Sequence, residues 1–292
     1  MKVTILTPTY NRLNTLPRLY DSLLKQTSKE FEWLIIDDGS KDNTKNYVNN
    51  IIKENKITIK YFYKNNGGKH RALNYGINKA INELIFFVDS DDWLKEDAVE
   101  QILYYGEKYK NNPKVACLSF HRAYPNMEIS GPHYKQKEFI SNYVDYRINE
   151  HVIGEGSEVV FADKLKEFPF LEIEGENFLS EGYLWIKMGM KYDTVYIDKA
   201  IYYFEYLQDG LTKNILKIKG KNPKGCVEVY KLYFNKNIKL IPKTKAMIKY
   251  INYSKIAKYT IKKSYKDCKS KLLFILVYPL GFLYYLSNKK YI

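Results

Sequence analysis

The chain has 292 residues, of which 45% are hydrophobic, so it can bury a sizeable core and is a globular protein of one large domain with an appendage or of two modest domains. Its formal net charge of +14 indicates attraction to polyanions, without choosing among nucleotide phosphates, nucleic acid and an anionic membrane face. The three cysteines lie far apart without a Cys-x-x-Cys spacing, which argues against a disulfide framework or a cysteine zinc site and predicts reduced thiols: Cys117, Cys226 and Cys268.

The start of the chain predicts where the protein works. Residues 1–6 run straight into a strand pattern and lack the charged region, apolar stretch and small-residue cleavage site of a signal peptide. We therefore expect the protein to stay in the cytoplasm.

Strand and helix patterns alternate along the first 120 residues. Five short segments rich in apolar, β-branched or aromatic residues predict strands: residues 3–7, 33–36, 57–63, 84–88 and 115–120. Apolar residues with the spacing of one helix face predict helices: residues 16–24, 48–52, 73–81 and 98–103. This alternation predicts an α/β fold with a mainly parallel, doubly wound sheet flanked by helices, in which ligands bind beyond the carboxyl ends of the strands.

Polar motifs follow the first two predicted strands. Residues 7–12 read Thr-Pro-Thr-Tyr-Asn-Arg, and residues 37–40 read Asp-Asp-Gly-Ser. Tyr10 offers a ring on which a base can stack. Four other side chains offer partners for base-edge amides and ribose hydroxyls: Thr7, Thr9, Asp37 and Asp38. The alternative is that residues 37–40 form a plain turn in which Gly39 supplies a positive φ.

A glycine loop with basic residues opens the third predicted helix. Residues 65–74 read Asn-Asn-Gly-Gly-Lys-His-Arg-Ala-Leu-Asn. Glycines allow close backbone approach and a helix N-terminus favours anions, so we expect Gly68, Lys69 and Arg71 to contact a diphosphate. The loop does not match a Walker motif, and no Gly-x-Gly-x-x-Gly follows the first strand. Both observations argue against a nucleoside triphosphatase or a dinucleotide dehydrogenase.

Three carboxylates fall within four positions directly after the fourth predicted strand: Asp89, Asp91 and Asp92. Bunched anions repel one another unless a cation or a hydrogen-bonding ligand sits among them, so the cluster predicts a divalent-metal or ligand-hydroxyl site. The alternative is a solvated turn whose acids cap the next helix. Because two other polar motifs end neighbouring strands, we favour the functional interpretation.

Residues 7–12, 37–40, 66–68 and 89–92, in this order and spacing, resemble the family-2 glycosyltransferases of the A-type fold. The resemblance covers residues 1–120 strongly and residues 120–215 more weakly. It implies an inverting transfer of a sugar from a nucleoside-diphosphate sugar, usually linked to UDP, to an acceptor hydroxyl.

The resemblance also implies roles for individual residues. It implies a nucleoside pocket lined by Thr7, Thr9, Tyr10 and Asp38. Asp89 would face the ribose or the donor sugar, and Asp91, with Asp92 as a second candidate, would hold Mn²⁺ or Mg²⁺ against the diphosphate. We also assign to donor binding the remaining candidates of these motifs: Pro8, Arg12, Asp37, Gly68, Lys69 and Arg71.

The catalytic base is expected in the second half of the chain. Relatives usually carry a Glu-Asp pair just before a helix with a Leu and a Trp, and the corresponding stretch here, residues 178–185, reads Phe-Leu-Ser-Glu-Gly-Tyr-Leu-Trp. The pair is not intact. Alignment on the Leu-Trp step points to Glu181, with Glu158 and Glu176 as weaker candidates. The alternative is that Glu181 only begins a helix near its positive end.

Two further segments carry predictions. Residues 206–214 are similar to the loop that closes the donor site in many relatives, although Asp-Gly is also a common turn signal. Residues 272–286 are apolar between lysine-bearing flanks, but they number fewer than the roughly 20 that a spanning helix needs, and Pro279 to Gly281 is expected to interrupt them. We expect an interfacial helix on anionic lipid, or else a helix packed on the core.

These observations predict a glycosyltransferase domain over residues 1–215, with donor binding in residues 1–120 and acceptor binding in residues 121–215, followed by a helical region over residues 216–292. The expected partners are a nucleoside-diphosphate sugar, a glycan or lipid-linked acceptor and the inner face of the cell membrane, and no nucleic acid. The rivals are a sugar-phosphate nucleotidyltransferase, which normally has a Gly-rich run after strand one, and a non-catalytic basic module that binds membranes or nucleic acid.

Overall fold

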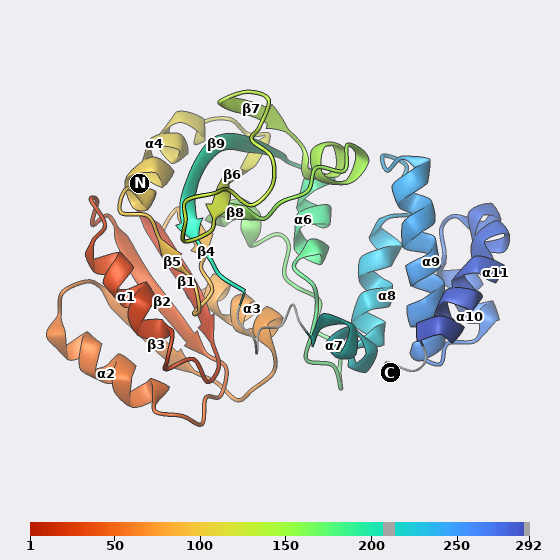
Figure 1. Ribbon diagram of the computed structural model, residues 1–292, viewed down its shortest axis with the longest axis horizontal. Coiled ribbons are helices and arrows are strands. Elements are labelled where there is room, and N and C mark those ends of the chain that lie inside the picture. The colour runs from red at the N-terminus through yellow and green to blue at the C-terminus, as the bar shows by residue number, and fades with distance from the viewer. Residues whose placement is uncertain (207–213, 289–292) are drawn as a thin grey trace. The chain divides into compact units, whose positions relative to one another are not determined.

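A nine-stranded mixed sheet organises the first of two compact units into which the chain divides (Figure 1). The computed structural model describes residues 1–206 and 214–288. The first unit comprises Met1–Asn142, Ile153–Pro169 and Lys191–Glu205. The second unit comprises Tyr143–Val152, Phe170–Met190 and the described residues from Tyr206 onward.

The first half of the sheet is parallel and carries the predicted strands. Its order is β3-β2-β1-β4, with β1 at Val3–Thr9, β2 at Phe31–Asp37, β3 at Ile59–Tyr63 and β4 at Leu84–Phe87. The helices between these strands are α1 (Leu16–Leu24), α2 (Thr44–Glu54) and α3 (Lys69–Lys79), and α4 (Ala98–Tyr109) follows. The five strands and four helices expected from the sequence are confirmed.

The second half of the sheet is largely antiparallel and was not predicted apart from β6. The order continues β4-β8-β6-β9-β5, and β7 also pairs with β9. Of these, only β6 and β9 run parallel to each other. The bounds are β5 (Trp93–Leu94), β6 (Val115–Ala123), β7 (Glu138–Ser141), β8 (Gly156–Phe161) and β9 (Asp193–Tyr203), with the short helix α5 at Ala162–Leu165. The expected α/β sheet flanked by helices is confirmed, in a mixed form.

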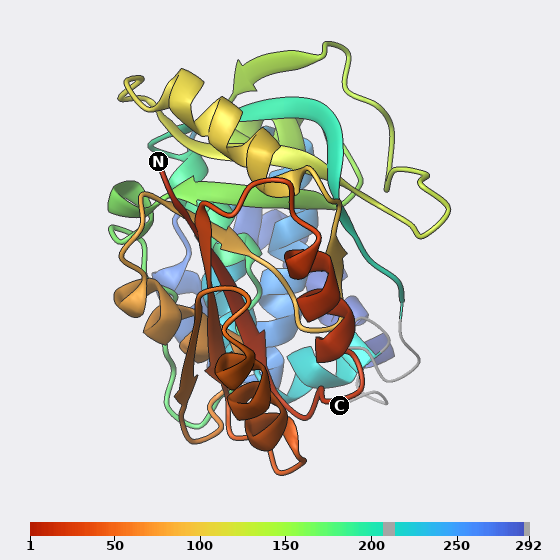
Figure 2. The ribbon, with the colours of Figure 1, turned by 90° about the vertical axis from the view of Figure 1, so that its left-hand side faces the viewer.

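Burial on both faces explains why β1 carries no charged residue along its length. All seven residues of β1 are buried, as expected for a central parallel strand. On one face, Ile5 and Trp33 belong to the core that α1, α2 and α4 cover. On the other face, α3 approaches so closely that a Cβ on Gly76 would lie 2.3 Å from the Leu6 side chain. Figures 1 and 2 show these helices on the two faces of the sheet.

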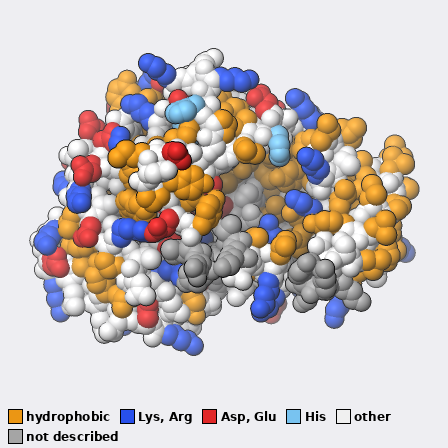
Figure 3. All heavy atoms as spheres, in the orientation of Figure 1, with side chains coloured by type: hydrophobic (Ala, Val, Ile, Leu, Met, Phe, Trp, Pro, Cys, Tyr) orange, Lys and Arg blue, Asp and Glu red, His pale blue; other side chains and the backbone are white. Residues whose placement is uncertain are grey.

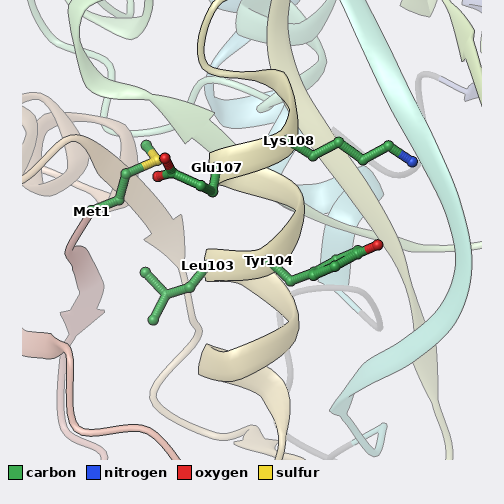
Figure 4. A pocket seen from close by; sticks show the side chains of 5 residues that line it. All are labelled: Met1, Leu103, Tyr104, Glu107 and Lys108. Carbon is green, nitrogen blue, oxygen red and sulfur yellow. The ribbon is translucent and has the colours of Figure 1, made fainter.

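A surface depression of about 740 Å³ lies against α4 (Figure 4). It is lined by Met1, Leu103, Tyr104, Glu107 and Lys108. Met1 precedes β1, so the depression lies toward the amino end of that strand. Ligands in open α/β sheets bind at the opposite, carboxyl ends, and the depression contains none of the predicted site residues.

The second unit is helical in its described residues. It contains a short π-helix, Val144–Asn149, and the helices α6 (Gly182–Gly189), α7 (Ile215–Lys221), α8 (Pro223–Leu232), α9 (Leu240–Ile256), α10 (Ile261–Asp267) and α11 (Lys271–Asn288). Residues of α8, α9 and α11 share a core that includes Val227, Met247, Tyr250 and Phe274. The expected helical C-terminal region is confirmed.

Helix α11 corrects one prediction. Pro279 and Gly281 do not interrupt it, because the helix continues through both residues. Gly281 instead lies so close to α9 that a Cβ there would be 2.7 Å from Ile251. Packing on α9 thus compensates for the hydrogen bond that proline removes. By length and composition, α11 is the one helix in the described part of the chain that could cross a membrane, and 17% of it is buried.

Candidate active site

Three polar motifs meet at the carboxyl ends of β1, β2 and β4, as the sequence predicted. The parallel register places Thr9 beside Asp37, and the Asp38 N–H donates to the Thr9 carbonyl at 2.8 Å. The Asn11 N–H donates to Ser40 Oγ at 2.9 Å. Thr15 Oγ1 donates to the Ser90 carbonyl at 2.9 Å, which ties the segment after β1 to the aspartate cluster.

The aspartates after β2 hold the backbone of the rim in place. The Asp37 carboxylate accepts from the Ser40 N–H at 2.7 Å and from the Tyr61 hydroxyl at 2.6 Å. The Asp38 carboxylate accepts from the Gly67 and Gly68 N–H groups, at 3.0 and 2.7 Å. Asp38 therefore joins the end of β2 to the glycine loop, and the predicted contacts of both aspartates with a nucleoside remain predictions.

The residues after β1 differ in what they offer to a ligand. Thr7 is fully buried and its hydroxyl accepts from Trp33 Nε1 at 3.0 Å. The Thr9 hydroxyl is buried and has no hydrogen-bond partner among residues 1–206 and 214–288. Tyr10 is 44% exposed, so its ring is available for stacking. An unpaired buried hydroxyl beside an exposed ring at a strand end is consistent with a ligand site.

The glycines of the rim are required by the backbone. Gly39 has φ +87°, as the sequence predicted, and a Cβ there would lie 2.7 Å from the Asn66 nitrogen. Gly68 has φ +94° and is the N-cap of α3. The first residue of that helix, Lys69, reaches the aspartate cluster, where its Nζ lies 2.5 Å from Asp89 Oδ1. The helix predicted to open at the glycine loop is confirmed.

The aspartate cluster lies among arginine and lysine side chains. Arg12 Nε lies 3.8 Å from Asp91 Oδ2. Arg122 Nη1, from the end of β6, lies 3.8 Å from Asp89 Oδ2 and 3.6 Å from Asp92 Oδ2. The three carboxylates are therefore not splayed into solvent, and the charges around them limit their mutual repulsion.

The pKa values of the cluster diverge. Burial raises the pKa of Asp89, but the charges of Lys69 and Arg122 outweigh it, so the pKa lies below its ordinary value. Burial and the charge of Asp89 raise the pKa of Asp91 against the effect of Arg12. Burial and the charge of Asp89 also raise the pKa of Asp92 to about 8. Asp91 and Asp92 therefore hold a proton more readily than an exposed aspartate does, mainly because they are buried.

Asp91 fits a metal ligand better than Asp92 does. The Asp91 side chain is 27% exposed. Asp92 is 6% exposed, and its Oδ2 accepts from the Tyr202 hydroxyl at 2.6 Å. The carboxylates of Asp89 and Asp91 are hard oxygen ligands of the kind that Mn²⁺ and Mg²⁺ prefer, so the residues present fit a divalent ion.

Sequence reasoning missed several residues that build the cluster. The Tyr202 hydroxyl accepts from the Asp89 N–H at 3.0 Å while it donates to Asp92, and the Arg122 guanidinium lies 4.2 Å from the centre of the Tyr202 ring. Arg18 donates to the Asp91 carbonyl at 2.6 Å and pairs with Glu205. Local patterns carried no signal for these contacts.

The three base candidates occupy different environments. Glu181 is the N-cap residue of α6, a position that both interpretations allow, so its catalytic role remains a prediction. The Glu176 carboxylate accepts from the Lys224 and Gly225 N–H groups at the start of α8, which indicates a capping role. Glu158 lies on β8, with Oε1 3.5 Å from Ser119 Oγ. The predicted lid loop falls mostly on residues 207–213, outside the described residues.

The raised pKa of Asp92 predicts a pH-dependent stability. In EDTA, the folded protein holds this proton up to about pH 8, whereas the unfolded chain releases it near pH 4, so stability decreases as the pH rises through this window. We expect the free energy of unfolding of Asp92→Asn to decrease less with rising pH than that of wild type, by up to about 1.4 kcal/mol per pH unit. Urea unfolding at several pH values measures it. If the free energy of unfolding changes with pH in the same way in Asp92→Asn, in wild type and in the surface control Asp163→Asn, the assignment is wrong.

Comparison with known proteins agrees with this geometry. The family described as Glycosyl transferase family 2 matches residues 4–160, which include all three rim motifs and the glycine loop. The chain spans only 17% to 32% of the length of the first curated relatives that it matches. One of these, an uncharacterized glycosyltransferase of Rickettsia conorii, is 42% identical over 41% of this chain and 19% of its own.

Two further relatives have names that state an activity. The poly(ribitol-phosphate) β-N-acetylglucosaminyltransferase TarP of Staphylococcus aureus is 32% identical over 51% of this chain and 47% of its own. The GalNAc(5)-diNAcBac-PP-undecaprenol β-1,3-glucosyltransferase of Campylobacter jejuni is 28% identical over 80% of this chain and 74% of its own.

Solved structures share the fold at low identity. S. aureus TarS 1–349 in complex with UDP-GlcNAc has a TM-score of 0.63 and 18% identity, over 99% of this chain and 92% of that chain. The mannosyltransferase PcManGT of Pyrobaculum calidifontis, in complex with GDP-Man and Mn²⁺, has a TM-score of 0.55 and 15% identity, over 99% and 84%. The family match over more than half of the chain, with the motifs assembled on one rim, establishes that this chain belongs to glycosyltransferase family 2.

Proposed function

We propose that this protein is a divalent-metal-dependent, inverting glycosyltransferase that moves a sugar from a nucleoside-diphosphate sugar to an acceptor hydroxyl. The observation that carries the proposal is the cluster of Asp89, Asp91 and Asp92 at the carboxyl end of β4, with Lys69 and Arg12 beside it. Such an arrangement suits a diphosphate held between a cation and basic side chains.

The donor would bind along the rim of β1, β2 and β4. Thr9 and Tyr10 would contact the nucleoside, since one has an unpaired buried hydroxyl and the other an exposed ring. Asp38 would contribute to the nucleoside pocket by holding the glycine loop in place. Lys69 at the N-terminus of α3 would face the diphosphate, where the helix dipole adds to its positive charge. These roles follow the family pattern.

Asp91, with Asp89, would hold Mn²⁺ or Mg²⁺. When bound, the ion neutralises the negative charge that develops on the diphosphate leaving group. Asp92 is the weaker ligand candidate because Tyr202 and Arg122 occupy its surroundings. The Mn²⁺ bound to PcManGT, which shares this fold, supports a divalent ion.

UDP is the proposed carrier because the family most often uses it and because TarS, which shares this fold, binds UDP-GlcNAc. The relatives TarP and the C. jejuni enzyme are named for transfer to poly(ribitol-phosphate) and to an undecaprenol-linked glycan. We therefore propose a glycan or lipid-linked acceptor in cell-surface glycan or glycolipid synthesis. The sugar itself depends on loops that no local pattern specifies.

Glu181 is the proposed catalytic base. Its carboxylate would take the proton of the acceptor hydroxyl as the oxygen attacks the anomeric carbon, while the bond from that carbon to the diphosphate oxygen breaks. Attack opposite the leaving group inverts the anomeric configuration. Glu176 is less suited, because both of its oxygens accept backbone N–H groups at the start of α8.

A cavity in the second unit supports acceptor binding near Glu181. It has a volume of about 180 Å³ and is lined by Ser180 and Gly182, the residues on either side of Glu181. Lys219 and Lys249 also line it. Two lysines in this cavity suit an acceptor that carries phosphate, such as a polyol phosphate or a lipid-linked diphosphate.

Helix α11 is the proposed contact with the inner face of the cell membrane. Its buried residues, Phe274, Val277 and Gly281, pack within the second unit, so this face of the helix is closed to lipid. Its outer face exposes Leu276 and Leu283, at 66% and 61%. Figure 3 shows hydrophobic side chains gathered over this end of the chain. Lysines in the flanking sequence suit an anionic surface: Lys266, Lys269 and Lys271.

These roles give the proposed division of labour. Residues 1–120 would bind the donor and residues 121–215, together with Lys219 and Lys249, the acceptor, while residues 216–292 form the helical region that would contact the membrane. We propose a cytoplasmic location with this peripheral attachment.

The metal assignment predicts the behaviour of Asp91→Asn. Calorimetric titration with UDP in Mn²⁺ should show at least tenfold weaker binding than wild type, because the substitution removes one charged metal ligand but keeps the side-chain shape. Without Mn²⁺, UDP should bind both proteins alike. Asp163→Asn, which removes a surface carboxylate, is the control. Equal Mn²⁺-dependent affinity in wild type and Asp91→Asn would refute the assignment.

A separate prediction concerns Glu181→Gln. The amide cannot accept the proton, so kcat should decrease by a factor of about 10² to 10⁴, while Mn²⁺-dependent UDP binding stays unchanged. A thermal-shift panel of nucleotide sugars with Mn²⁺ first selects the donor, and donor turnover with an acceptor extract then gives kcat. A variant with wild-type turnover would show that another group acts as the base.

The membrane proposal predicts that exposed leucines of α11 hold the protein on anionic vesicles. The double variant Leu276→Asn and Leu283→Asn should pellet less than wild type with vesicles of phosphatidylglycerol and phosphatidylcholine, because apolar area no longer inserts. The control is Ile81→Asn with Met127→Asn, which removes equally exposed apolar residues from the first unit, at 74% and 76% exposure. If both double variants pellet as wild type does, α11 is not the contact.

A further inference from the structure

A histidine–aspartate–histidine cluster in the first unit plays no part in the proposed transfer. It joins His121 on β6, His133 in the segment between β6 and β7, and Asp198 on β9. His121 Nε2 lies 2.8 Å from Asp198 Oδ1, and His133 Nδ1 lies 3.1 Å from each Asp198 oxygen. The three ligand atoms all lie within 4.8 Å of one another.

An irregularity in the sheet brings Asp198 to the histidines. Phe120 of β6 pairs with Ile197 of β9, but the next residue, His121, pairs with Ala200. Two extra residues of β9, Asp198 and Lys199, therefore lie opposite a single step of β6. Bulges of this kind re-aim side chains and often lie beside functional sites. Here the bulge holds the Asp198 carboxylate against His121.

Tyr134 holds the cluster in place, as the groups around a metal site orient its ligands. The Tyr134 N–H donates to Asp198 Oδ1 at 2.9 Å. The Tyr134 ring packs on the His121 ring, with centroids 3.9 Å apart. The Asp198 pKa is low although burial raises it, because the Tyr134 N–H and both histidines outweigh burial, so the carboxylate is anionic near neutral pH.

We propose that His121, His133 and Asp198 bind one Zn²⁺ ion. Two imidazoles and one carboxylate form a three-ligand set that zinc accepts, with a fourth position for water. Bond lengths of about 2.0–2.2 Å place tetrahedral ligand atoms about 3.3 Å apart, close to the separations found between Asp198 and each histidine. His133 is 73% exposed, so its ring can rotate to complete the geometry.

The ligand chemistry separates this site from the aspartate cluster. Asp89 and Asp91 offer only oxygen ligands, which suit Mn²⁺ and Mg²⁺, whereas imidazole nitrogens favour zinc and its neighbours in the first transition row. Arg122 follows His121 in β6 and lies 3.6 Å from Asp92 instead. Zinc at the histidines would join the segment that carries His133 to β6 and β9.

The test titrates Zn²⁺ into the EDTA-stripped and dialysed full chain that carries Asp91→Asn, which weakens the aspartate site. Calorimetry should show one Zn²⁺ per chain, and adding His133→Ala should weaken binding at least tenfold. His133 is exposed, so its loss should leave the fold intact. His151→Asn is the matched control, because it removes an exposed histidine outside the cluster from a residue with φ +57°, which asparagine tolerates.

Two further measurements decide the outcome. Co²⁺ should give visible d–d absorption bands that disappear with His133→Ala and remain with His151→Asn, and Zn²⁺ should raise the unfolding temperature of the parent but not of the His133→Ala protein. Equal Zn²⁺ affinity with and without His133, or no binding to the parent, would overturn the proposal and leave a metal-free hydrogen-bonded cluster. UDP binding with Mn²⁺ is measured apart from this, so failure here leaves the transferase proposal standing.

Discussion

The repulsion among three carboxylates at the end of β4 is the constraint around which the first unit is built. Lys69 and Arg12 reach the cluster from the segments after β3 and β1, and Arg122 reaches it from the far half of the sheet. The Tyr202 hydroxyl bridges the Asp89 backbone and the Asp92 side chain. Even so, burial and the charge of Asp89 raise the pKa values of Asp91 and Asp92. A fold that stabilises such a site keeps it ready for a ligand that brings a cation.

The two halves of the sheet contribute different residues to the site. Its parallel half aligns the carboxyl ends of β1, β2 and β4, where Asp38 joins strand end to glycine loop by accepting two backbone N–H groups. Its other half supplies Arg122, which lies close to the Asp89 carboxylate, and Tyr202, whose ring packs against the Arg122 guanidinium. The same half carries the bulge at Asp198 that assembles the histidine cluster. One half thus carries the proposed donor site, while the other half contributes long-range contacts to its aspartates.

The second unit carries the features that would set the acceptor and the location. Glu181 begins α6, and a cavity that includes Lys219 and Lys249 lies beside it. Helix α11 buries one face in the core of this unit and exposes leucines on another. Each feature combines a stabilising contact inside the unit with a surface for a partner. This combination explains how a proline in the middle of α11 is accommodated, since packing on α9 holds the helix on both sides of it.

The sequence by itself determined the strand and helix pattern of the first 120 residues, the need for glycine at position 39 and the three motifs of the rim. These features depend on local periodicity, on a positive φ and on residues next to one another in the chain, all of which a linear pattern records. Only the tertiary structure decided that Asp37 supports a turn, that Arg122 and Tyr202 hold the aspartates, and that His121, His133 and Asp198 meet. The physical reason is that these contacts join residues up to 113 positions apart, through antiparallel pairings and a bulge whose register depends on packing rather than on local sequence.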